Sequence, residues 1–579
     1  MAKNVMKVLK PSPNLGRNAF DLSHRNIFTA NFGELLPCCC LETVPSNDYV
    51  EIKPANLLRA MPLATSPFLR AKQHIDFWFV PYSSLWSRFN EFMSDKNEPS
   101  SSSLKSRDYL PYTGLDDLYV EAATDNKYDV VGQDYSRGAR KLLNLLGYSA
   151  HAGWVSEEGQ YKVNLFRLAA YNFIWYKEYR QKYYDDGTYL MNPGVTPSYL
   201  WNLDDVLCNS VSNADVFLQR SHNTNQAMLQ MRYRCFKKDL FTGLMPSTQF
   251  GSVSVVNSSS LHSRLSFVDS SGNSKNYVAL STTNNGDLVG STTLQNGSAP
   301  STWANTPVYM RSGQDISSLN ILDLRKAEAV QRWRENALRA GNQIEDNFEA
   351  HYGAKPHSHM ITHPIFIGSY SAPLNIGDVV STAHTGDGVN SQLGDIAGKG
   401  ISSLDGQTIK FKTTDFGVIM GLFSLLPEAE YNALGVDRMN QLLEREDFFI
   451  PEYENLGLEP VPLATFFGGY INTENVSPVV GFAPRYWGYK QKFDQCFGEM
   501  MHNYFNTGMF AHWCSPKADV VPTLLNNDGT VPLSCLYVNP AIYDVNFNTG
   551  VADNDQFLVD QYNEVTAIRG MSVSGMPNY

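Results

Sequence analysis

Short segments in which hydrophobic and polar residues alternate recur along the whole chain, and they predict β-strands. In residues 74–81, Ile75, Phe77 and Phe79 fall on one face of an extended chain, while His74, Asp76 and Trp78 fall on the other. Most such segments are bounded by Pro, Asn or Asp, which is typical of β-sandwiches and barrels. The clearest predicted strands are residues 27–37, 49–53, 74–81, 409–413 and 416–426.

Helical periodicity interrupts these strands. The strongest helix is predicted over residues 319–340, because Ser317 and Ser318 precede it as candidate N-caps and Gly341 suits its end. Its apolar residues share one face, and its many arginines crowd the rest. Further helices are predicted over residues 85–93, 136–146, 165–184 and 428–443.

The composition changes sharply over residues 247–307, where Ser, Thr, Asn and Gly make up roughly half of the residues. Residues 265–268 and 277–280 still alternate, so we interpret the segment as an exposed, β-rich insertion. Complete disorder of this segment is the alternative. Residues 382–407, rich in Gly, Ser and Asp, predict a second exposed loop.

The predicted strands are scattered over the whole chain, which favours one elaborated, mainly β domain over a string of separate domains. We divide the chain into a basic N-terminal arm (1–26), a first part of the β framework with helical insertions (27–246), the exposed insertion (247–307) and a remainder (308–579). The remainder holds further helices, the 382–407 loop and a C-terminal extension.

The overall composition excludes several classes of protein. With 579 residues, of which 43% are hydrophobic and 12% aromatic, the chain can build a large core, unlike a disordered, collagen-like or coiled-coil protein. No apolar run is long enough to span a membrane, and the N-terminus lacks the apolar segment of a secretion signal. The eight cysteines are too sparse for a disulfide scaffold, and we interpret them as reduced, buried side chains.

The net charge of −12 argues against nucleic-acid binding through bulk charge. The N-terminal arm nevertheless carries a local basic patch, opposed only by Asp21. The candidate residues for contact with a polyanion such as DNA are Lys3, Lys7, Lys10, Arg17 and Arg25. A solvated, disordered tail is the alternative.

No local motif that we tested for catalysis is complete. Residues 398–400 lack the Ser or Thr that follows the lysine of a phosphate-binding loop, and residues 570–575 have the wrong spacing for a nucleophile elbow. His357, His359 and His363 are the best metal candidates, but the absence of further ligands favours surface or interface histidines. The residues therefore predict no cofactor, although a glycosidase carboxylate pair could hide among the many acids.

Several blocks far apart in the chain form a collinear set. They are Phe20-Asp-Leu-Ser-His24, residues 27–37, Asp76-Phe-Trp-Phe-Val-Pro81 with Leu85-Trp86, residues 240–246, 324–327 and 351–353, Pro364-Ile-Phe-Ile-Gly368, residues 373–376 and Val573-Ser-Gly-Met-Pro577. Their order and spacing resembles the major capsid proteins of the Microviridae, the small icosahedral single-stranded DNA phages, and in particular the gokushovirus-like branches. The resemblance covers nearly the whole chain, and only residues 247–307 and 382–407 match poorly.

The resemblance implies an eight-stranded antiparallel jelly roll with long helical and loop insertions. It implies that sixty copies form a T=1 icosahedral shell around circular single-stranded DNA, and it implies no catalytic residue. Residues 247–307 would project at the threefold axes and serve in host attachment. The protein would be part of the virion, made and assembled in the cytoplasm of the host bacterium.

The net charge adds an expectation about where the basic residues lie. Sixty copies at −12 each cannot neutralise packaged DNA, so we expect the charge to be segregated, with the basic arm facing the interior. The arm has too few cations for a whole genome. A separate small basic peptide, or bound cations, should therefore be needed. The resemblance implies a small basic DNA-binding virion protein for this role, and a pilot protein and a host cell-surface receptor as further partners.

Two rival functions remain open at this stage. A β-rich adhesin or tail protein would share the Ser/Thr/Asn-rich insertion but should lack a basic N-terminal arm. A secreted carbohydrate-active enzyme would need a signal peptide and a carboxylate pair in a cleft.

Overall fold

The computed structural model describes residues 16–63, 68–94, 110–115, 118–119, 134–148, 161–181, 201–203, 228–249, 266–268, 274–275, 280–282, 288–290, 309–311, 321–340, 349–353, 363–380, 396–431, 435–465, 479–498, 536–547 and 555–573. The chain divides into two compact units. The larger one comprises Met1–Thr248 and Ala340–Tyr579, and the smaller one comprises Gln249–Arg339.

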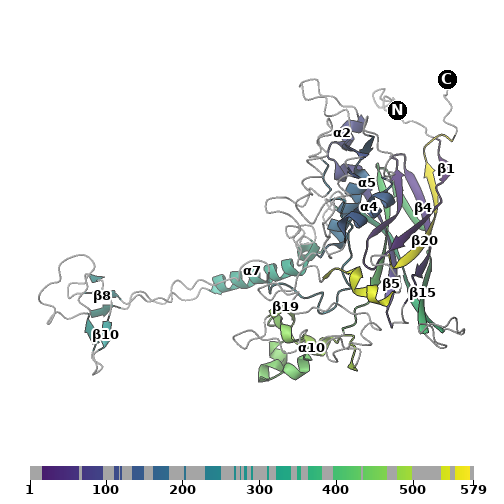
Figure 1. The fold of residues 1–579 in the computed structure, drawn as a ribbon. Helices are drawn as coiled ribbons and strands as arrows, with labels where there is room; N and C mark the ends of the chain where they lie inside the picture. The colour runs from purple at the N-terminus through teal and green to yellow at the C-terminus, as the bar shows by residue number, and fades with distance from the viewer. Residues whose placement is uncertain are drawn as a thin grey trace, which may run out of the picture. The chain divides into compact units, whose positions relative to one another are not determined.

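Two antiparallel sheets form the centre of the larger unit (Figure 1). The seven-stranded sheet contains β1 (Asn18–Asp21), β2 (His24–Ala30), β20 (Phe557–Arg569), β4 (Asp48–Ala60), β15 (Ile396–Asp405), β16 (Ile409–Thr413) and β14 (Asn375–Val380). The four-stranded sheet has the order β13 (Ile365–Pro373), β5 (Ala71–Pro81), β17 (Gly417–Pro427) and β3 (Leu36–Thr43). β20 pairs with β1 and β2 on one side and with β4 on the other, so strands more than 500 residues apart become neighbours.

The main hydrophobic core lies between these two sheets. Phe28 of β2 packs edge-on against Phe423 of β17, with ring centroids 5.6 Å apart. Phe79 of β5 likewise packs against Phe411 of β16, with ring centroids 5.1 Å apart. The inward-pointing residues of β5 thus meet the opposite sheet, as the predicted alternation in residues 74–81 requires.

Helices cover the other face of the four-stranded sheet. α4 (Tyr135–Leu146) is capped by Asp134, whose side chain accepts the Ser136 amide, and α5 (Phe166–Ile174) continues as a π-helical turn, η3 (Trp175–Tyr179). Nearly every residue of α5 is buried. The short elements α1 (Tyr82–Leu85), α2 (Phe89–Ser94), β6 (Tyr112–Gly114) and β7 (Lys162–Asn164) complete this layer.

A buried carboxylate ties the helical layer to the four-stranded sheet. Asp76 points away from the inter-sheet core, and its Oδ2 accepts hydrogen bonds from the Tyr179 hydroxyl at 2.7 Å and Arg234 Nη1 at 3.1 Å. Its Oδ1 accepts a hydrogen bond from the Ser369 hydroxyl of β13. Burial, aided by the nearby Arg234, lowers the pKa of the adjacent His74 to about 4, so this imidazole is neutral at pH 7.

A second polar cluster fixes the start of β20. Lys141 of α4 forms ion pairs with Glu34 at 2.6 Å and with Asp555 at 3.1 Å, and Arg137 reaches Asp555 at 2.9 Å. Burial raises the pKa of Asp555, but the Lys141 charge, the hydrogen bond from Thr29 and the Arg137 charge outweigh it, so the pKa is lowered overall. The cluster therefore joins α4, the N-terminal strands and the entry to β20.

Residues 428–431, 435–465 and 479–498 add a subdomain with a small core of its own. Its described elements are η7 (Arg438–Gln441), η8 (Arg445–Asp447), η9 (Pro451–Tyr453), β18 (Leu458–Pro462), η10 (Leu463–Thr465), β19 (Val479–Pro484) and α10 (Trp487–Lys490). Val461, Leu463 and Trp487 pack there against Phe241 and Leu244. A further turn, η15 (Pro540–Asn546), precedes β20.

The smaller unit contains two little antiparallel sheets and most of a long helix. β8 (Ser266–Val268) pairs with β9 (Ser274–Lys275) and β12 (Tyr309–Arg311), and β10 (Leu280–Thr282) pairs with β11 (Leu288–Gly290). α7 (Ile321–Ala340) matches the helix predicted over residues 319–340.

The strands predicted at 49–53, 74–81, 409–413 and 416–426 are confirmed, as is the helix at 136–146. Cys38 and Cys39 are buried and unbridged, and burial raises the pKa of the neighbouring Cys40 thiol to about 12. Cys208, Cys514 and Cys535 lie outside the described residues.

Several predicted segments have other boundaries in the structure. Residues 18–21 and 24–30 belong to the sheet, so the arm predicted over 1–26 is shorter, and the strand predicted over 27–37 is broken at 31–35. The helix predicted over 85–93 is two short ones, and that over 165–184 ends at Tyr179. At the break between residues 31 and 35, the carboxylate of Glu34 forms a largely buried ion pair with Lys141 at 2.6 Å.

Two further expectations fail for identifiable reasons. The loop predicted over 382–407 is wrong for residues 396–405, which form β15 between β14 and β4. Gly400 is required by close packing there, since a Cβ on it would lie 2.8 Å from that of Ala60. Of the helix predicted over 428–443, only the 3-10 turn η7 forms among the described residues, and Tyr431 instead packs in the subdomain core and pairs with Gln495.

We expect Asp76→Asn to lower the free energy of unfolding by about 3 kcal/mol, because it leaves the half-buried Arg234 without its carboxylate. Urea unfolding followed by tryptophan fluorescence measures this change. The control is Asp405→Asn, whose 77% exposed side chain pairs with Lys53 across 3.4 Å and should contribute less than about 0.5 kcal/mol. Equal losses in the two variants would show that Asp76 does not organise the layer.

Candidate nucleic-acid interface

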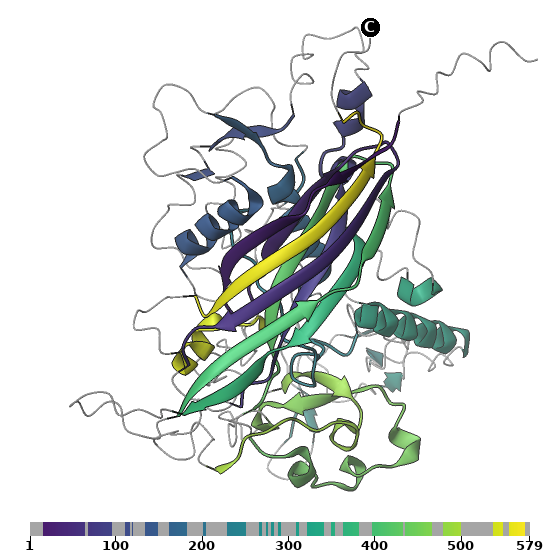
Figure 2. The same cartoon turned by 90° about the vertical axis from the view of Figure 1, so that its right-hand side faces the viewer.

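No described helix covers the outer face of the seven-stranded sheet, which is turned toward the viewer in Figure 2. Alternation along β20 turns Phe557, Val559 and Val565 inward, where they are buried, and turns the residues between them outward. The antiparallel register then decides which outward side chains of β2 and β4 stand beside them.

Aromatic, aliphatic and basic residues meet in the middle of this face. Tyr562 of β20 is 45% exposed and lies between Arg25 of β2 and Ala55 of β4. Leu558 precedes Tyr562 by four residues in β20, a distance of about 13 Å. Its neighbour across the strand pair is Arg59 of β4. An exposed tyrosine ring next to guanidinium groups can stack on a nucleobase while the cations approach phosphates.

Basic residues slightly outnumber acidic ones at the outward positions, although the chain as a whole is acidic. The basic set is Arg25, Lys53, Arg59, Lys399, Lys410 and Lys412, and the acidic set is Asp21, Glu51, Asp405, Asp560 and Glu564. Lys53 pairs with Asp405 and Lys410 with Glu51, each across about 3.5 Å. Within the described part of the chain, no hydrogen bond or ion pair engages the side chains of Arg59, Lys399 and Lys412.

The structure places two of the five predicted DNA-facing residues. Arg25 lies on the outer face and forms a two-point ion pair with Asp560, at 2.6 and 2.7 Å. The hydrogen bond from Arg25 is the main cause of the lowered pKa of Asp560. Arg17 donates to the carbonyl oxygens of Asn47 and Ile568 at the end of the sheet. Lys3, Lys7 and Lys10 lie outside the described residues.

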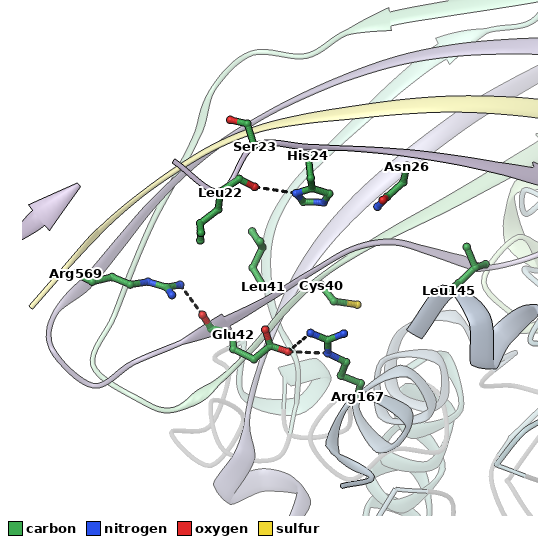
Figure 3. A pocket seen from close by; sticks show the side chains of 10 residues that line it. All are labelled: Leu22, Ser23, His24, Asn26, Cys40, Leu41, Glu42, Leu145, Arg167 and Arg569. Carbon is green, nitrogen blue, oxygen red and sulfur yellow. Dashed lines mark hydrogen bonds and ion pairs between the residues drawn. The ribbon is translucent and has the colours of Figure 1, made fainter. Parts of the chain in front are cut away.

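A cavity of about 520 Å³ opens at the same end of the sandwich, between β2 and β3 (Figure 3). Arg167 and Arg569 line it from different elements, and both hold Glu42: Arg167 pairs with its carboxylate at 2.5 Å, and Arg569 donates to its carbonyl oxygen at 2.5 Å. Arg569 also pairs with the buried Asp48 at 3.0 Å. Both arginines are thus paired with carboxylates of the chain itself. The residues that line the cavity connect β20 to β3, and the cavity does not form an anion-binding site.

The histidines that the sequence singled out do not form a described site. His357 and His359 lie outside the described residues, and His363 is almost fully buried. Among the side chains whose positions are described, no group of three or more His, Cys, Asp or Glu could hold a metal ion. In that same part of the chain, no helix is long and apolar enough to cross a membrane.

The sequence reasoning missed Tyr562, Arg59 and Lys412. The strict alternation over residues 557–569 could have identified Tyr562 as a surface residue of a half-buried strand. The register that brings it beside Arg25 depends on pairing across the whole chain, which no local pattern specifies.

Comparison with known proteins adds independent information. The model of a family described as capsid protein (F protein) matches residues 10–114 and 141–579. Capsid protein VP1 of Chlamydia phage 1 is 22% identical over 627 residues, which cover 98% of this chain and 96% of the relative. Capsid protein VP1 of Bdellovibrio phage phiMH2K is 21% identical over 591 residues, with the same two shares covered.

We expect Tyr562→Ala to weaken the binding of single-stranded DNA at least about fivefold, because it removes a stacking surface. Fluorescence anisotropy with a labelled oligo-thymidylate measures this affinity. Arg59→Ala should also lower the affinity and make the slope of log affinity against log salt shallower by about 0.7.

Tyr161→Ala is the matched control, since Tyr161 is 75% exposed but lies in the helical layer. It should leave the affinity unchanged. The same loss of affinity in Tyr161→Ala and Tyr562→Ala would rule out the outer face as the binding surface.

Proposed function

The chain belongs to the capsid protein (F protein) family, and from this premise we propose that sixty copies assemble into a T=1 icosahedral shell around circular single-stranded DNA. The family and its phage relatives give the chain the structural role of a major capsid protein, as the Microviridae resemblance predicted. The single observation that carries the proposal is the match of the family model to nearly the entire chain.

The strand order supports an eight-stranded jelly roll. β2, β20, β4 and the β15–β16 segment form one sheet, and β3, β17, β5 and β13 form the facing sheet. On this interpretation β1 and β14 are additions at the sheet edges. Such a double sheet suits a shell because its loops can extend to neighbouring copies while the core stays unchanged. The long segments between β5 and β13 and between β17 and β20 supply those loops.

The outer face of the seven-stranded sheet is proposed to line the interior of the shell. It combines an exposed tyrosine with uncommitted cations, which suits weakly sequence-selective contact with single strands. The basic arm, with Lys3, Lys7 and Lys10, would add to it from the same side. The cations of one chain remain too few for a genome, so we propose a small basic DNA-binding protein and a pilot protein as further virion components.

Host attachment is assigned to the insertion at residues 247–307, which we propose as the protrusion at the threefold axes. Its Ser/Thr/Asn/Gly-rich composition and its short strands support a surface role. We propose that the chain consists of a basic arm, two parts of the β framework and the insertion between them, and that the framework begins at β1. The virion is the site of function, and we propose the cytoplasm of the host bacterium as the site of assembly.

Expression of the chain in bacteria should yield particles of megadalton mass, because sixty copies of a 64.8 kDa chain associate. Sedimentation velocity and negative-stain microscopy measure the mass and the symmetry. A trimer would instead favour an adhesin or tail protein, and a monomer that cleaves glycosidic bonds would favour the carbohydrate-active enzyme.

Replacing residues 250–305 by a short linker should leave shell assembly intact and reduce infectivity at least about tenfold, because the insertion forms part of a separate compact unit. Particle yield and plaque counts on the natural host measure the two effects. Loss of the particles would make the insertion structural, and unchanged infectivity would remove it from host attachment.

A further inference from the structure

The core-facing side of the seven-stranded sheet carries a row of side-chain amides. Asn56 of β4 and Gln561 and Asn563 of β20 point inward with the hydrophobic residues, and each of them is at most 5% exposed. The antiparallel register places Asn56 opposite Gln561, and it places His24 of β2 opposite Asn563. Because buried polar groups need hydrogen-bond partners, the amides and the imidazole must satisfy one another.

These side chains form one continuous series of hydrogen bonds, which we name the amide chain. Asn56 Nδ2 donates to Gln561 Oε1 at 2.9 Å, and Gln561 Nε2 donates to Asn563 Oδ1 at 2.9 Å. Asn563 Nδ2 lies 3.3 Å from His24 Nε2, and it also donates to the carbonyl oxygen of Cys38 at 3.3 Å. Every amide thus donates in the direction of His24.

Both ends of the amide chain fix this direction. At the buried end, Asn56 Oδ1 has no hydrogen-bond partner among the described residues. A reversed chain would place the Nδ2 group there, and folded proteins tolerate a buried N–H without an acceptor less often than a buried oxygen without a donor. At the other end, Asn563 must keep its Nδ2 group toward the Cys38 carbonyl oxygen, which can only accept. The amide chain therefore requires an acceptor at His24 Nε2.

His24 meets this requirement only as a neutral imidazole. Its Nδ1 lies 2.9 Å from the carbonyl oxygen of Leu22, so the ring proton is on Nδ1 and Nε2 keeps a lone pair (Figure 3). A second proton, on Nε2, would bring two donors against each other, because the Asn563 Nδ2 group lies 3.3 Å away.

The imidazole is accessible to protons, since His24 is only half-buried and lines the cavity of about 520 Å³. The titratable and charged groups around it are Arg167 of α5, Glu42 and Cys40 of β3, Arg569 of β20 and Asp21 of β1. Glu42 is paired with Arg167 at 2.5 Å, and Asp21 accepts the Ser23 amide at 3.0 Å. Both acids are therefore engaged already, and the two arginines disfavour a further positive charge.

The amide chain also joins the two sheets. The register of β3 with β17 shifts between Gly421 and Leu422 and passes over Cys38. The carbonyl oxygen of Cys38 accepts hydrogen bonds from Asn563 of β20 and, at 2.8 Å, from Asn26 of β2. Among the described strands, β2 pairs with β20 alone. A change at Asn563 therefore acts both on the neighbour of β2 and on the contact with β3.

We propose that His24 is an acid-sensitive latch, in which protonation of Nε2 breaks the end of the amide chain and loosens β2 and the adjoining part of β20 from β3. Because the folded arrangement excludes the second proton, the latch is closed at neutral and alkaline pH. It opens as the pH falls through the range in which histidines titrate, between about 8 and 5. The latch is a property of the folded chain and needs no shell, so it is independent of the proposed capsid function.

Hydrogen exchange followed by mass spectrometry tests the latch strand by strand. Between about pH 7.5 and about pH 5.5, the amides of residues 24–30 should lose protection at least about tenfold after correction for intrinsic exchange, whereas those of β5 should change less than about twofold. In His24→Gln the loss over residues 24–30 should also stay below about twofold, because a side-chain amide can accept from Asn563 and donate to Leu22 without titrating.

His74→Gln is the matched control, since burial lowers the pKa of the His74 imidazole to about 4, below the range of the experiment. It should retain the full loss of protection. Asn563→Asp gives the opposite test, because a carboxylate oxygen can accept from a protonated Nε2. In this variant, protection of residues 24–30 should rise on acidification, and the sign of the response remains readable even if the variant is less stable.

A loss of the same size in His24→Gln and in the unmodified chain would overturn the proposal, as would a loss that disappears in His74→Gln. Either result would assign the pH response to another group. Unchanged protection in the unmodified chain, or a fall in protection on acidification of Asn563→Asp, would overturn it as well.

Discussion

The inner strands of the four-stranded sheet, β5 and β17, are buried on both faces, and this constraint limits which surfaces of the larger unit remain available. Nearly every residue of β17 is buried, including those on both sides of the strand. One face packs on the seven-stranded sheet, and the other is closed by α5, η3 and the contacts of Asp76 with Tyr179 and Arg234. Of the two sheets, only the seven-stranded one has a face that no described helix covers, and the proposed contact with DNA is assigned to the outward residues of that face.

The sequence predicted the local parts of this arrangement well and the long-range parts poorly. The alternation in residues 74–81 identified β5 and separated Phe77 from Asp76, because the period of a strand is fixed by backbone geometry. It could not show that both faces would be covered. The glycines of β15 indicated a loop when only the sequence was considered. The reason for Gly400 is that a side chain there would collide with Ala60, and this contact exists only when β15 pairs with β4. The cations of the N-terminal arm were found from charge alone, whereas the register of β4, β20 and β2 alone places Tyr562 beside Arg25 and Leu558 beside Arg59.

Charge is distributed over the chain according to what each surface contacts. The largely buried ion pair of Lys141 with Glu34 joins α4 to the N-terminal strands. On the outer sheet face, by contrast, no hydrogen bond or ion pair engages the side chains of Arg59, Lys399 and Lys412 within the described residues. An acidic chain can in this way have one surface suited to a polyanion without a change in total charge.

The central position of β20 has a consequence for synthesis in the cell. Until residues 557–569 leave the ribosome, β4 lacks its neighbour on one side, and β1 and β2 have no partner strand among the described elements. The unfinished sheet exposes open edges that invite pairing with other chains. Completion of the sheet must therefore wait until residues 557–569 have been made, so a polypeptide terminated before them cannot complete the sheet and would be left out of the finished particle.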